Sequence, residues 1–87
     1  MSLIKNVETR SGSTYYIDEE RGLWKKNNDG WERTWWAYSV PVNIANFANA
    51  EKEERLPLTV GLRMYIGSKD IWWLTSVIES ITEVENV

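Results

Sequence analysis

Hydrophobic and polar residues alternate in short stretches along this chain, and turn residues separate the stretches. The first two stretches, 3–9 and 14–18, are typical of strands, and they are joined by a turn in which Gly12 can supply a positive φ. Because one face of such a hairpin must be buried, we expect Tyr15 and Ile17 to be the inward pair. The alternation therefore predicts an N-terminal β-hairpin.

The stretch 22–40 carries four of the six tryptophans around Asp29-Gly30. This dipeptide suits a two-residue type I′ turn, whose central positions both need positive φ, so we predict a second hairpin. In that register Trp24 lies opposite Trp35. Trp35 and Trp36 are adjacent, and successive strand side chains point to opposite faces, so one of them must face away from the core.

A third hairpin is predicted between 59–66 and 71–75, with Ser68-Lys69 as its loop. Gly61 within its first strand suggests a bulge or a close backbone approach. One face of this hairpin collects the side chains that we expect in the core, which are Leu62, Met64, Ile66, Ile71 and Trp73. The opposite face carries Arg63, Tyr65 and Trp72.

The hydrophobic period changes after the second hairpin. Ile44, Phe47 and Ala48 have the spacing of one helical face, and Asn43 is placed to cap it. This pattern predicts a short helix near 43–54. A mobile polar loop is the competing interpretation.

The tail at 76–85 fits two periods. The spacing of its valines and isoleucines suits a helix, and Ser76 with Glu79 fits a capping box. The same residues are β-branched and alternate, and a strand here would pair an edge that the earlier strands leave open. We favour a closing strand, and the helix stays as the alternative.

Together these elements define one domain, 1–87, of the mainly β class. We expect five or six antiparallel strands, with three consecutive hairpins curled into a small SH3-like or open barrel and one short helix near 43–54. A domain of 87 residues buries a modest fraction of its surface. Its stability is therefore expected to depend on large side chains or on oligomerisation.

The composition excludes several functions. The chain has no cysteine and no histidine, which excludes disulfides, the usual zinc ligands and histidine-based catalysis within it. Its net charge is −3 and no basic stripe is visible, so binding to duplex nucleic acid is disfavoured. The longest apolar run, 71–74, is far shorter than a membrane span. We expect a soluble cytoplasmic protein, with no membrane partner, no metal and no cofactor.

The candidate binding site is a set of aromatic and arginine side chains on the outward faces of the second and third hairpins. Arginine over an indole gains about 0.5–2 kcal/mol from the cation–π interaction, and such residues are enriched at interfaces. Stacked aromatic rings with arginines also suit a nucleotide base. The alternative is that a helix or the other sheet covers these rings. The set comprises Trp24, Trp31, Arg33, Trp35, Arg63, Tyr65 and Trp72.

Three further polar groups have simpler interpretations. The turn at 10–14 could receive an anion on its amides and hydroxyls, but serine and glycine are ordinary turn residues. The acids at 18–20 and at Asp29 lie at predicted turns, where solvated charge is the default. A carboxylate pair for catalysis or a hard cation is therefore not favoured. The charged run at 51–55 is expected to be a solvated helix end.

Residues 7–18, and residues 61–66 together with 74–81, resemble small uncharacterised proteins encoded by bacteriophages and prophages of actinobacteria. The resemblance covers about a third of the chain. It implies an N-terminal hairpin and a closing strand of a small barrel, in a phage accessory protein that acts on a host component. Such a protein would work in the host cytoplasm. The present chain has Val77 where those proteins usually have a proline after the Thr-Ser pair.

We expect a non-enzymatic binding protein, of phage accessory or host-interaction type, whose partner is a protein or a second copy of the chain. The alternative is an oligomer that sequesters a nucleotide or another small signal on its aromatic and arginine side chains. An enzyme ranks third. Without histidine or cysteine it would depend on carboxylates, lysine or a hydroxyl, and none of these has a visible partner in the sequence.

Overall fold

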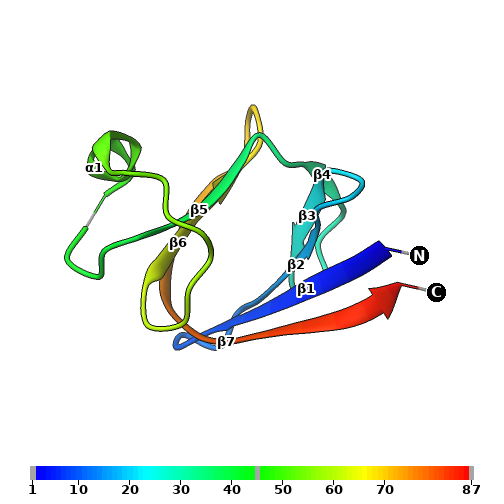
Figure 1. Ribbon diagram of the computed structural model, residues 1–87. Helices are drawn as coiled ribbons and strands as arrows, with labels where there is room; N and C mark the ends of the chain where they lie inside the picture. Colours follow the sequence, from blue (N-terminus) through cyan, green and yellow to red (C-terminus); the bar gives the residue numbers. More distant parts are fainter. Residues whose placement is uncertain (1, 45, 87) are drawn as a thin grey trace.

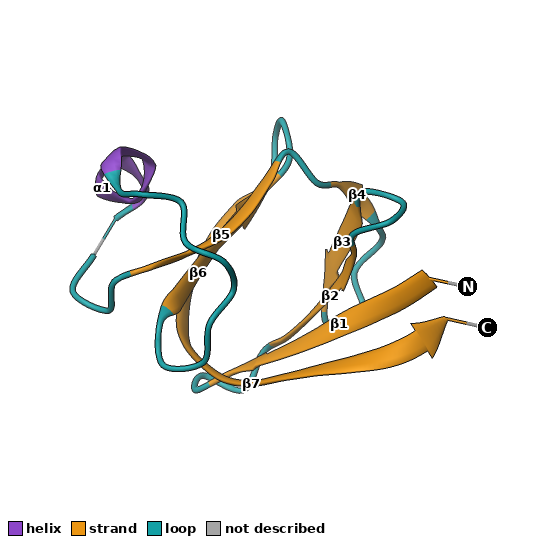
Figure 2. Cartoon of the chain, viewed as in Figure 1, coloured by secondary structure: helices purple, strands orange, loops and turns teal. Residues whose placement is uncertain are grey.

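The computed structural model describes residues 2–44 and 46–86, which form seven strands and one helix (Figures 1 and 2). All seven strands belong to one antiparallel sheet, so the predicted mainly β class is confirmed. The elements are β1 (Ser2–Thr9), β2 (Thr14–Asp18), β3 (Leu23–Lys26), β4 (Glu32–Arg33), β5 (Trp36–Val40), α1 (Phe47–Lys52), β6 (Arg63–Gly67) and β7 (Trp72–Asn86).

The sheet curls into an open half-barrel. Its strand order is β4-β3-β2-β1-β7-β6-β5, so β4 and β5 are the two edges although they follow each other in the chain. Thr34 and Trp35 join them, and so short a link requires the two edges to approach each other. Figure 1 shows β2, β3 and β4 as one wall and β5 and β6 as the other, with the long strands β1 and β7 below them.

The first hairpin is confirmed as β1 and β2, which pair with Val7 opposite Tyr15. Gly12 has a φ of 93°, and its N–H donates to the Thr9 carbonyl at 2.9 Å. The turn thus uses the positive φ that glycine adopts without strain. Tyr15 and Ile17 are both buried, as predicted.

The predicted register of the second hairpin is wrong. Trp24 pairs with Glu32 instead of lying opposite Trp35. The turn is made by Asn27, whose φ is 51°, and not by Asp29-Gly30. The expected return strand is also divided into β4 and β5, which gives seven strands where five or six were predicted.

The expected return strand is divided because the chain passes from one wall of the half-barrel to the other at Thr34 and Trp35. The Trp35 N–H donates to the Gly67 carbonyl at 2.9 Å, and Trp36 pairs with Gly67. β5 therefore pairs with β6 and not with β3. Local turn residues cannot indicate this change, since the strand that captures β5 comes later in the chain.

The third hairpin is confirmed as β6 and β7, with its loop one residue later than predicted. The loop is 69–70, closed by a hydrogen bond of 2.7 Å from the Ser68 N–H to the Ile71 carbonyl. Next to the loop the cross-strand pairings move by two positions, because Tyr65 is opposite Leu74 and Ile66 is opposite Trp73. A shift of two leaves these side chains on their predicted faces. Tyr65 and Trp72 accordingly lie on the same face, as predicted.

The bulge in this hairpin lies in β7, where Thr75 and Ser76 are opposite Met64, and not at Gly61. Gly61 belongs to a turn before β6, where its φ is 94°. The register shifts between Arg63 and Tyr65. There the Met64 N–H donates to the Thr75 hydroxyl at 3.1 Å, which replaces a backbone partner.

The tail forms a strand and not a helix. It continues the third hairpin within β7, which pairs first with β6 and then with β1, so the predicted closing strand is confirmed. Its pairing with β1 contains a bulge, because Glu8 is opposite Ser80 and Thr9 is opposite Ile78. The bulge lets Ile78 and Ile81 pack against the same cluster, and their spacing of three explains why the sequence also fits a helix.

Two hydrophobic clusters share β6. Met64 and Ile66 belong to the first cluster, and Tyr65, between them, belongs to the second. Met64 and Ile66 are buried as predicted, whereas Ile71 and Trp73 stay more than one-third exposed. The first cluster comprises Val7, Tyr15, Ile17, Trp24, Met64, Ile66 and Ile78. The second comprises Tyr38, Val40, Ile44, Ala50 and Tyr65.

The helix α1 is shorter than predicted and is capped by another residue. The Asn46 side-chain oxygen accepts a hydrogen bond of 3.0 Å from the Asn49 N–H, so Asn46 and not Asn43 is the N-cap. The buried residue of the helix is Ala50, whose carbonyl accepts from the Tyr38 hydroxyl at 3.4 Å. The helix therefore covers the second cluster.

Candidate functional site

Four of the seven predicted site residues are exposed. The exposed fractions of Trp31, Trp35 and Trp72 are 42%, 57% and 43%, and Arg33 is exposed in β4. Trp36 is only partly exposed, so Trp35 is the more open of the adjacent pair. The reason predicted for this is wrong, because Trp35 lies in the link between β4 and β5 and not in a pleated strand. The predicted shared face of the second hairpin, with Trp24, Trp31, Arg33 and Trp35, is wrong, because Trp24 is opposite Glu32 and Trp35 lies in the link after β4.

The other three predicted site residues belong to packed structure. Trp24 is 1% exposed in the first cluster, and Tyr65 is 2% exposed in the second. The Arg63 Nε donates to the Thr75 carbonyl at 2.7 Å, and its Nη1 donates to the Ile44 carbonyl. Placing these three on an open surface was wrong. The curled sheet encloses Trp24, and the segment that contains α1 covers Tyr65.

A row of aromatic rings crosses β5, β6 and β7 and reaches α1. The ring centroids are 5.3 Å apart for Trp36 and Tyr65, and 6.4 Å apart for Tyr65 and Trp72. Trp72 in turn lies 4.5 Å from Phe47. Phe47 is 44% exposed, although its spacing predicted a buried helical position, so sequence reasoning missed it. The row thus runs from packed rings to open ones.

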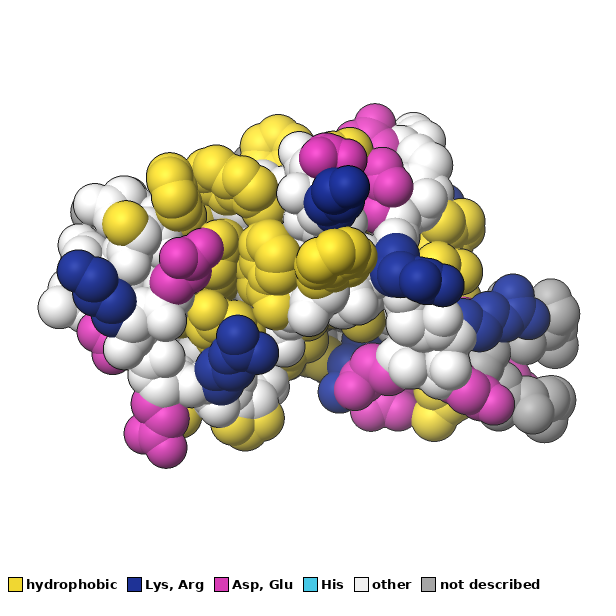
Figure 3. Space-filling view, turned by 90° about the horizontal axis from the view of Figure 1, so that it is seen from above, with side chains coloured by type: hydrophobic (Ala, Val, Ile, Leu, Met, Phe, Trp, Pro, Cys, Tyr) yellow, Lys and Arg dark blue, Asp and Glu magenta, His cyan; other side chains and the backbone are white. Residues whose placement is uncertain are grey.

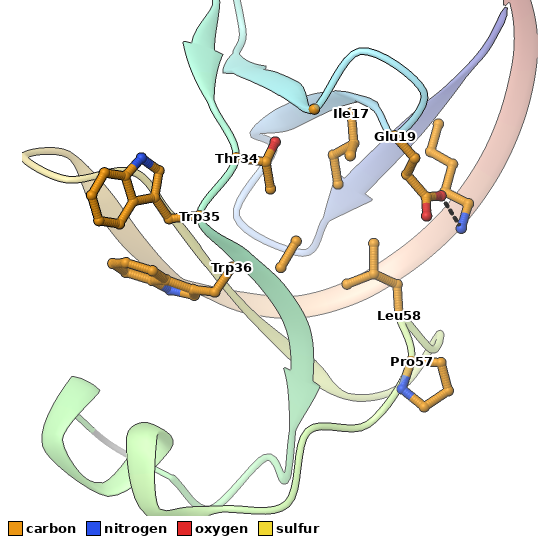
Figure 4. A pocket seen from close by; sticks show the side chains of 10 residues that line it. Ile17, Glu19, Thr34, Trp35, Trp36, Pro57 and Leu58 are labelled. Atoms are coloured by element: carbon orange, nitrogen blue, oxygen red, sulfur yellow. Dashed lines mark ion pairs between the residues drawn. The ribbon is translucent and has the colours of Figure 1, made fainter.

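Trp35 lies beside this row. Its N–H donates to Gly67, which pairs with Trp72 on the next strand. Figure 4 shows the side chains of Trp35 and Trp36 projecting to one side, away from Leu58. We call Trp35, Phe47 and Trp72 the outer aromatic surface. In Figure 3 hydrophobic side chains form a continuous area over the open top of the half-barrel, with charged side chains at its margins.

A cleft of about 420 Å³ lies between the two walls (Figure 4). Ile17 comes from one wall, and Leu58 comes from the segment that follows α1. At one end the Lys5 ammonium pairs with the Glu19 carboxylate at 2.5 Å. The buried Thr34 hydroxyl, also in the lining, has no hydrogen-bond partner among the described residues. The cleft therefore offers apolar walls with few free polar groups.

A smaller hollow, of about 210 Å³, lies between the β3–β4 hairpin and the start of β7. Across it the Lys26 Nζ atom is 3.4 Å from the centroid of the Trp73 ring. Sequence reasoning did not select Lys26 or Trp73, because they lie far apart in the chain and no local pattern connects them. We call this space the indole hollow. Its lining comprises Trp24, Lys26, Asp29, Gly30, Trp31, Glu32, Ile71 and Trp73.

The described groups with raised pKa values are tyrosines of the two clusters. Burial raises the pKa of Tyr15 to about 12. Burial also raises the pKa of Tyr65 to about 12, and the hydrogen bond of 3.1 Å that its hydroxyl donates to Glu51 adds to the effect. The pKa of Tyr38 is raised by burial as well, against the opposing charge of Arg55. All three phenols are kept protonated by packing.

Among residues 2–44 and 46–86, no three His, Cys, Asp or Glu side chains are grouped so that they could hold a metal ion. Over those residues, no helix has the length and apolar character that crossing a bilayer requires.

Comparisons with protein-family models, with curated proteins and with solved structures found no match for this chain.

Proposed function

We propose that this chain is a non-enzymatic binding protein that associates with another protein through the outer aromatic surface. The observation that supports this most is the contact between Phe47 and Trp72. Their ring centroids are 4.5 Å apart, yet both side chains are more than 40% exposed. Burying such rings contributes about 25 cal/mol per Å² of apolar area, and aromatic residues dominate the binding energy of protein interfaces.

The shape of this surface favours a protein over a small ligand. Phe47 and Trp72 come from different elements, and Trp35 comes from the link between the walls. Figure 3 shows a broad apolar area with charged side chains at its margin, which is the anatomy of a protein interface. Small-molecule sites are instead concave and enclose most of the ligand.

The simplest partner is a second copy of the chain. A two-fold dimer would place the same aromatic surface of both copies face to face, and a domain of 87 residues gains stability from such burial. The alternative within this proposal is a host protein. The resemblance of two stretches to phage-encoded barrel proteins supports an accessory role of that kind in the host cytoplasm.

Trp72→Ser tests the surface directly. We expect the native chain to associate with rising concentration, and we expect the variant to weaken this association at least about tenfold, because a central aromatic anchor is lost. Sedimentation velocity over a concentration series measures both. Val84→Ser is the matched control, since Val84 is a 45% exposed apolar residue at the far end of β7.

A native chain that stays monomeric at every concentration would rule out the self-association version. The host-protein version then predicts that the native chain captures a partner from lysate and that Trp72→Ser does not. Equal capture by both proteins, with unfolding transitions unchanged, would contradict the proposal.

A further inference from the structure

The indole hollow is built from the inward faces of both walls. Trp24 of β3 lies opposite Ile17 of β2 and Glu32 of β4, and it belongs to the first cluster. Lys26 is two residues further along β3, so its side chain leaves on the same face. On the other side, Trp73 of β7 pairs with the buried Ile66. The two walls therefore face each other across the hollow.

The chain already places its own ammonium group in this hollow. The Lys26 Nζ atom lies 3.4 Å from the centroid of the Trp73 ring, which is a close cation–π contact. The neighbouring Lys25 leaves β3 on the other face, and its Nζ is 5.2 Å from the centroid of Trp31. Both partly exposed indoles of the hollow thus attract ammonium groups in this structure.

The lining of the indole hollow has more acidic than basic residues, which favours a further cation. Asp29, Glu32 and Lys26 line the hollow, so two acidic residues and one basic residue border it. The ion pairs formed by the described residues join Lys5 to Glu19 and Arg21 to Asp18, so neither lining carboxylate has a cationic partner within salt-bridge distance. One net negative charge therefore remains in a space with aromatic walls.

Aromatic walls select the kind of cation. A hard metal ion takes six or more oxygen ligands, and among residues 2–44 and 46–86 no three acidic side chains are grouped so that they could hold one. A methylated ammonium keeps its charge and presents apolar methyl groups, which is the chemistry that aromatic cages recognise. The volume of about 210 Å³ suits a head group rather than a large ligand.

We propose that the indole hollow binds an alkylated ammonium group, seated on Trp31 and Trp73 and balanced by Asp29 and Glu32. Lys26 occupies part of the same aromatic face and competes with the incoming cation. This inference does not depend on the proposed function, because the outer aromatic surface uses other side chains. Trp72→Ser should leave ammonium binding unchanged.

Titration with tetramethylammonium chloride at constant ionic strength tests the site, with the tryptophan indole N–H resonances as the readout. We expect saturable shifts with a dissociation constant on the order of 1 mM, since a small head group gains only a few kcal/mol. Methylammonium should bind more weakly and ammonium most weakly, because hydration competes with the rings. Equal shifts with sodium or ammonium, or no saturable shift, would overturn the proposal.

Four variants test which residues of the indole hollow contribute to ammonium binding. Trp73→Leu should weaken tetramethylammonium binding about tenfold, and Glu32→Gln should weaken it several-fold even if Trp73→Leu folds poorly. Lys26→Met should strengthen binding about threefold, because the competing charge is removed. Lys52→Met, which removes an exposed charge from α1, is the matched control and should have no effect. Unchanged or weaker binding in Lys26→Met would overturn the proposed competition.

Two further ligands separate the sources of the ammonium group. Choline represents a free small molecule, and N-acetyl-trimethyl-lysine amide represents a protein side chain. Tighter binding of choline supports the first source, and tighter binding of the lysine derivative supports the second. Failure of both to bind would overturn the proposal.

Discussion

At the scale of single residues, Gly67 determines how the outer face packs. A Cβ at this position would lie 2.4 Å from Trp36 Cζ2 and 2.7 Å from Trp72 Cβ. The indole of Trp36 therefore occupies the space that a side chain of residue 67 would need. The φ of Gly67 is not in the left-handed region, so the close approach of Trp36, and not backbone conformation, requires glycine here.

Gly67→Ala should destabilise the fold by about 1–3 kcal/mol, because the added methyl group must displace a packed indole. Denaturant unfolding measures the change in the free energy of unfolding. Gly30→Ala is the control, since a Cβ there meets no atom within 4 Å. If both substitutions lower the free energy of unfolding equally, the packing of Trp36 does not require glycine at position 67.

At the scale of elements, the short helix α1 packs against the sheet and contributes to the second cluster. Its six residues have little stability of their own, so the helix depends on its cap and on packing against the sheet. Ala50 is fully buried in the second cluster, and the Tyr65 hydroxyl donates to the Glu51 carboxylate at 3.1 Å. The helix thus closes one side of the cluster around Tyr65.

Asn46→Ala should destabilise the protein by about 1 kcal/mol, because it removes the side-chain acceptor of the Asn49 N–H. Near-UV circular dichroism should also change, since the rings of Tyr38 and Tyr65 lie beneath the helix. Asn49→Ala keeps the capped backbone group and should be neutral or slightly stabilising. An equal loss in both variants would show that the cap is not the cause.

At the scale of the whole molecule, one strand connects the two clusters. β6 places Met64 and Ile66 in the first and Tyr65 in the second, so the two clusters are expected to unfold together. Each cluster also holds a buried tyrosine whose pKa is about 12, Tyr15 in the first and Tyr65 in the second. Alkaline pH should therefore act on both at once.

We expect the stability that Tyr15 and Tyr65 contribute to be fully present below about pH 10 and to be lost as the pH rises to about 12. The folded-state pKa values exceed that of an unfolded tyrosine, so the folded protein binds more protons in this window and deprotonation favours unfolding. The loss should reach about 2–3 kcal/mol per tyrosine. Denaturant unfolding across the window measures it. Tyr15→Phe should remove the part of this pH-dependent loss that comes from Tyr15. An unchanged pH dependence in that variant would contradict the prediction.

The sequence was most informative where structure depends on neighbours in the chain. The first hairpin was predictable because Gly12 and the alternation around Tyr15 act locally. In the third hairpin the loop was misplaced by one residue, which moved the pairings of Tyr65 and Ile66 by two positions and left their faces unchanged. The exposure of Trp72 agrees with its predicted outward face, whereas Trp35 is exposed in the link between β4 and β5, where the pleat argument does not apply.

The remaining errors concern contacts between distant parts of the chain. Trp24 was assigned to an open surface because both faces of a lone hairpin are open, and only curling of the sheet buries it. Tyr65 is covered by a segment whose position the pattern does not specify. The approach of Lys26 to Trp73 likewise exists only because two walls face each other.

The order of residues by itself determined that this chain forms antiparallel β-hairpins with an excess of aromatic side chains, because pleating and turn chemistry act over a few residues. The tertiary structure alone decided which of those rings are enclosed and which are open. Burial depends on where the curled sheet and α1 bring distant segments together, and no short-range pattern contains that information.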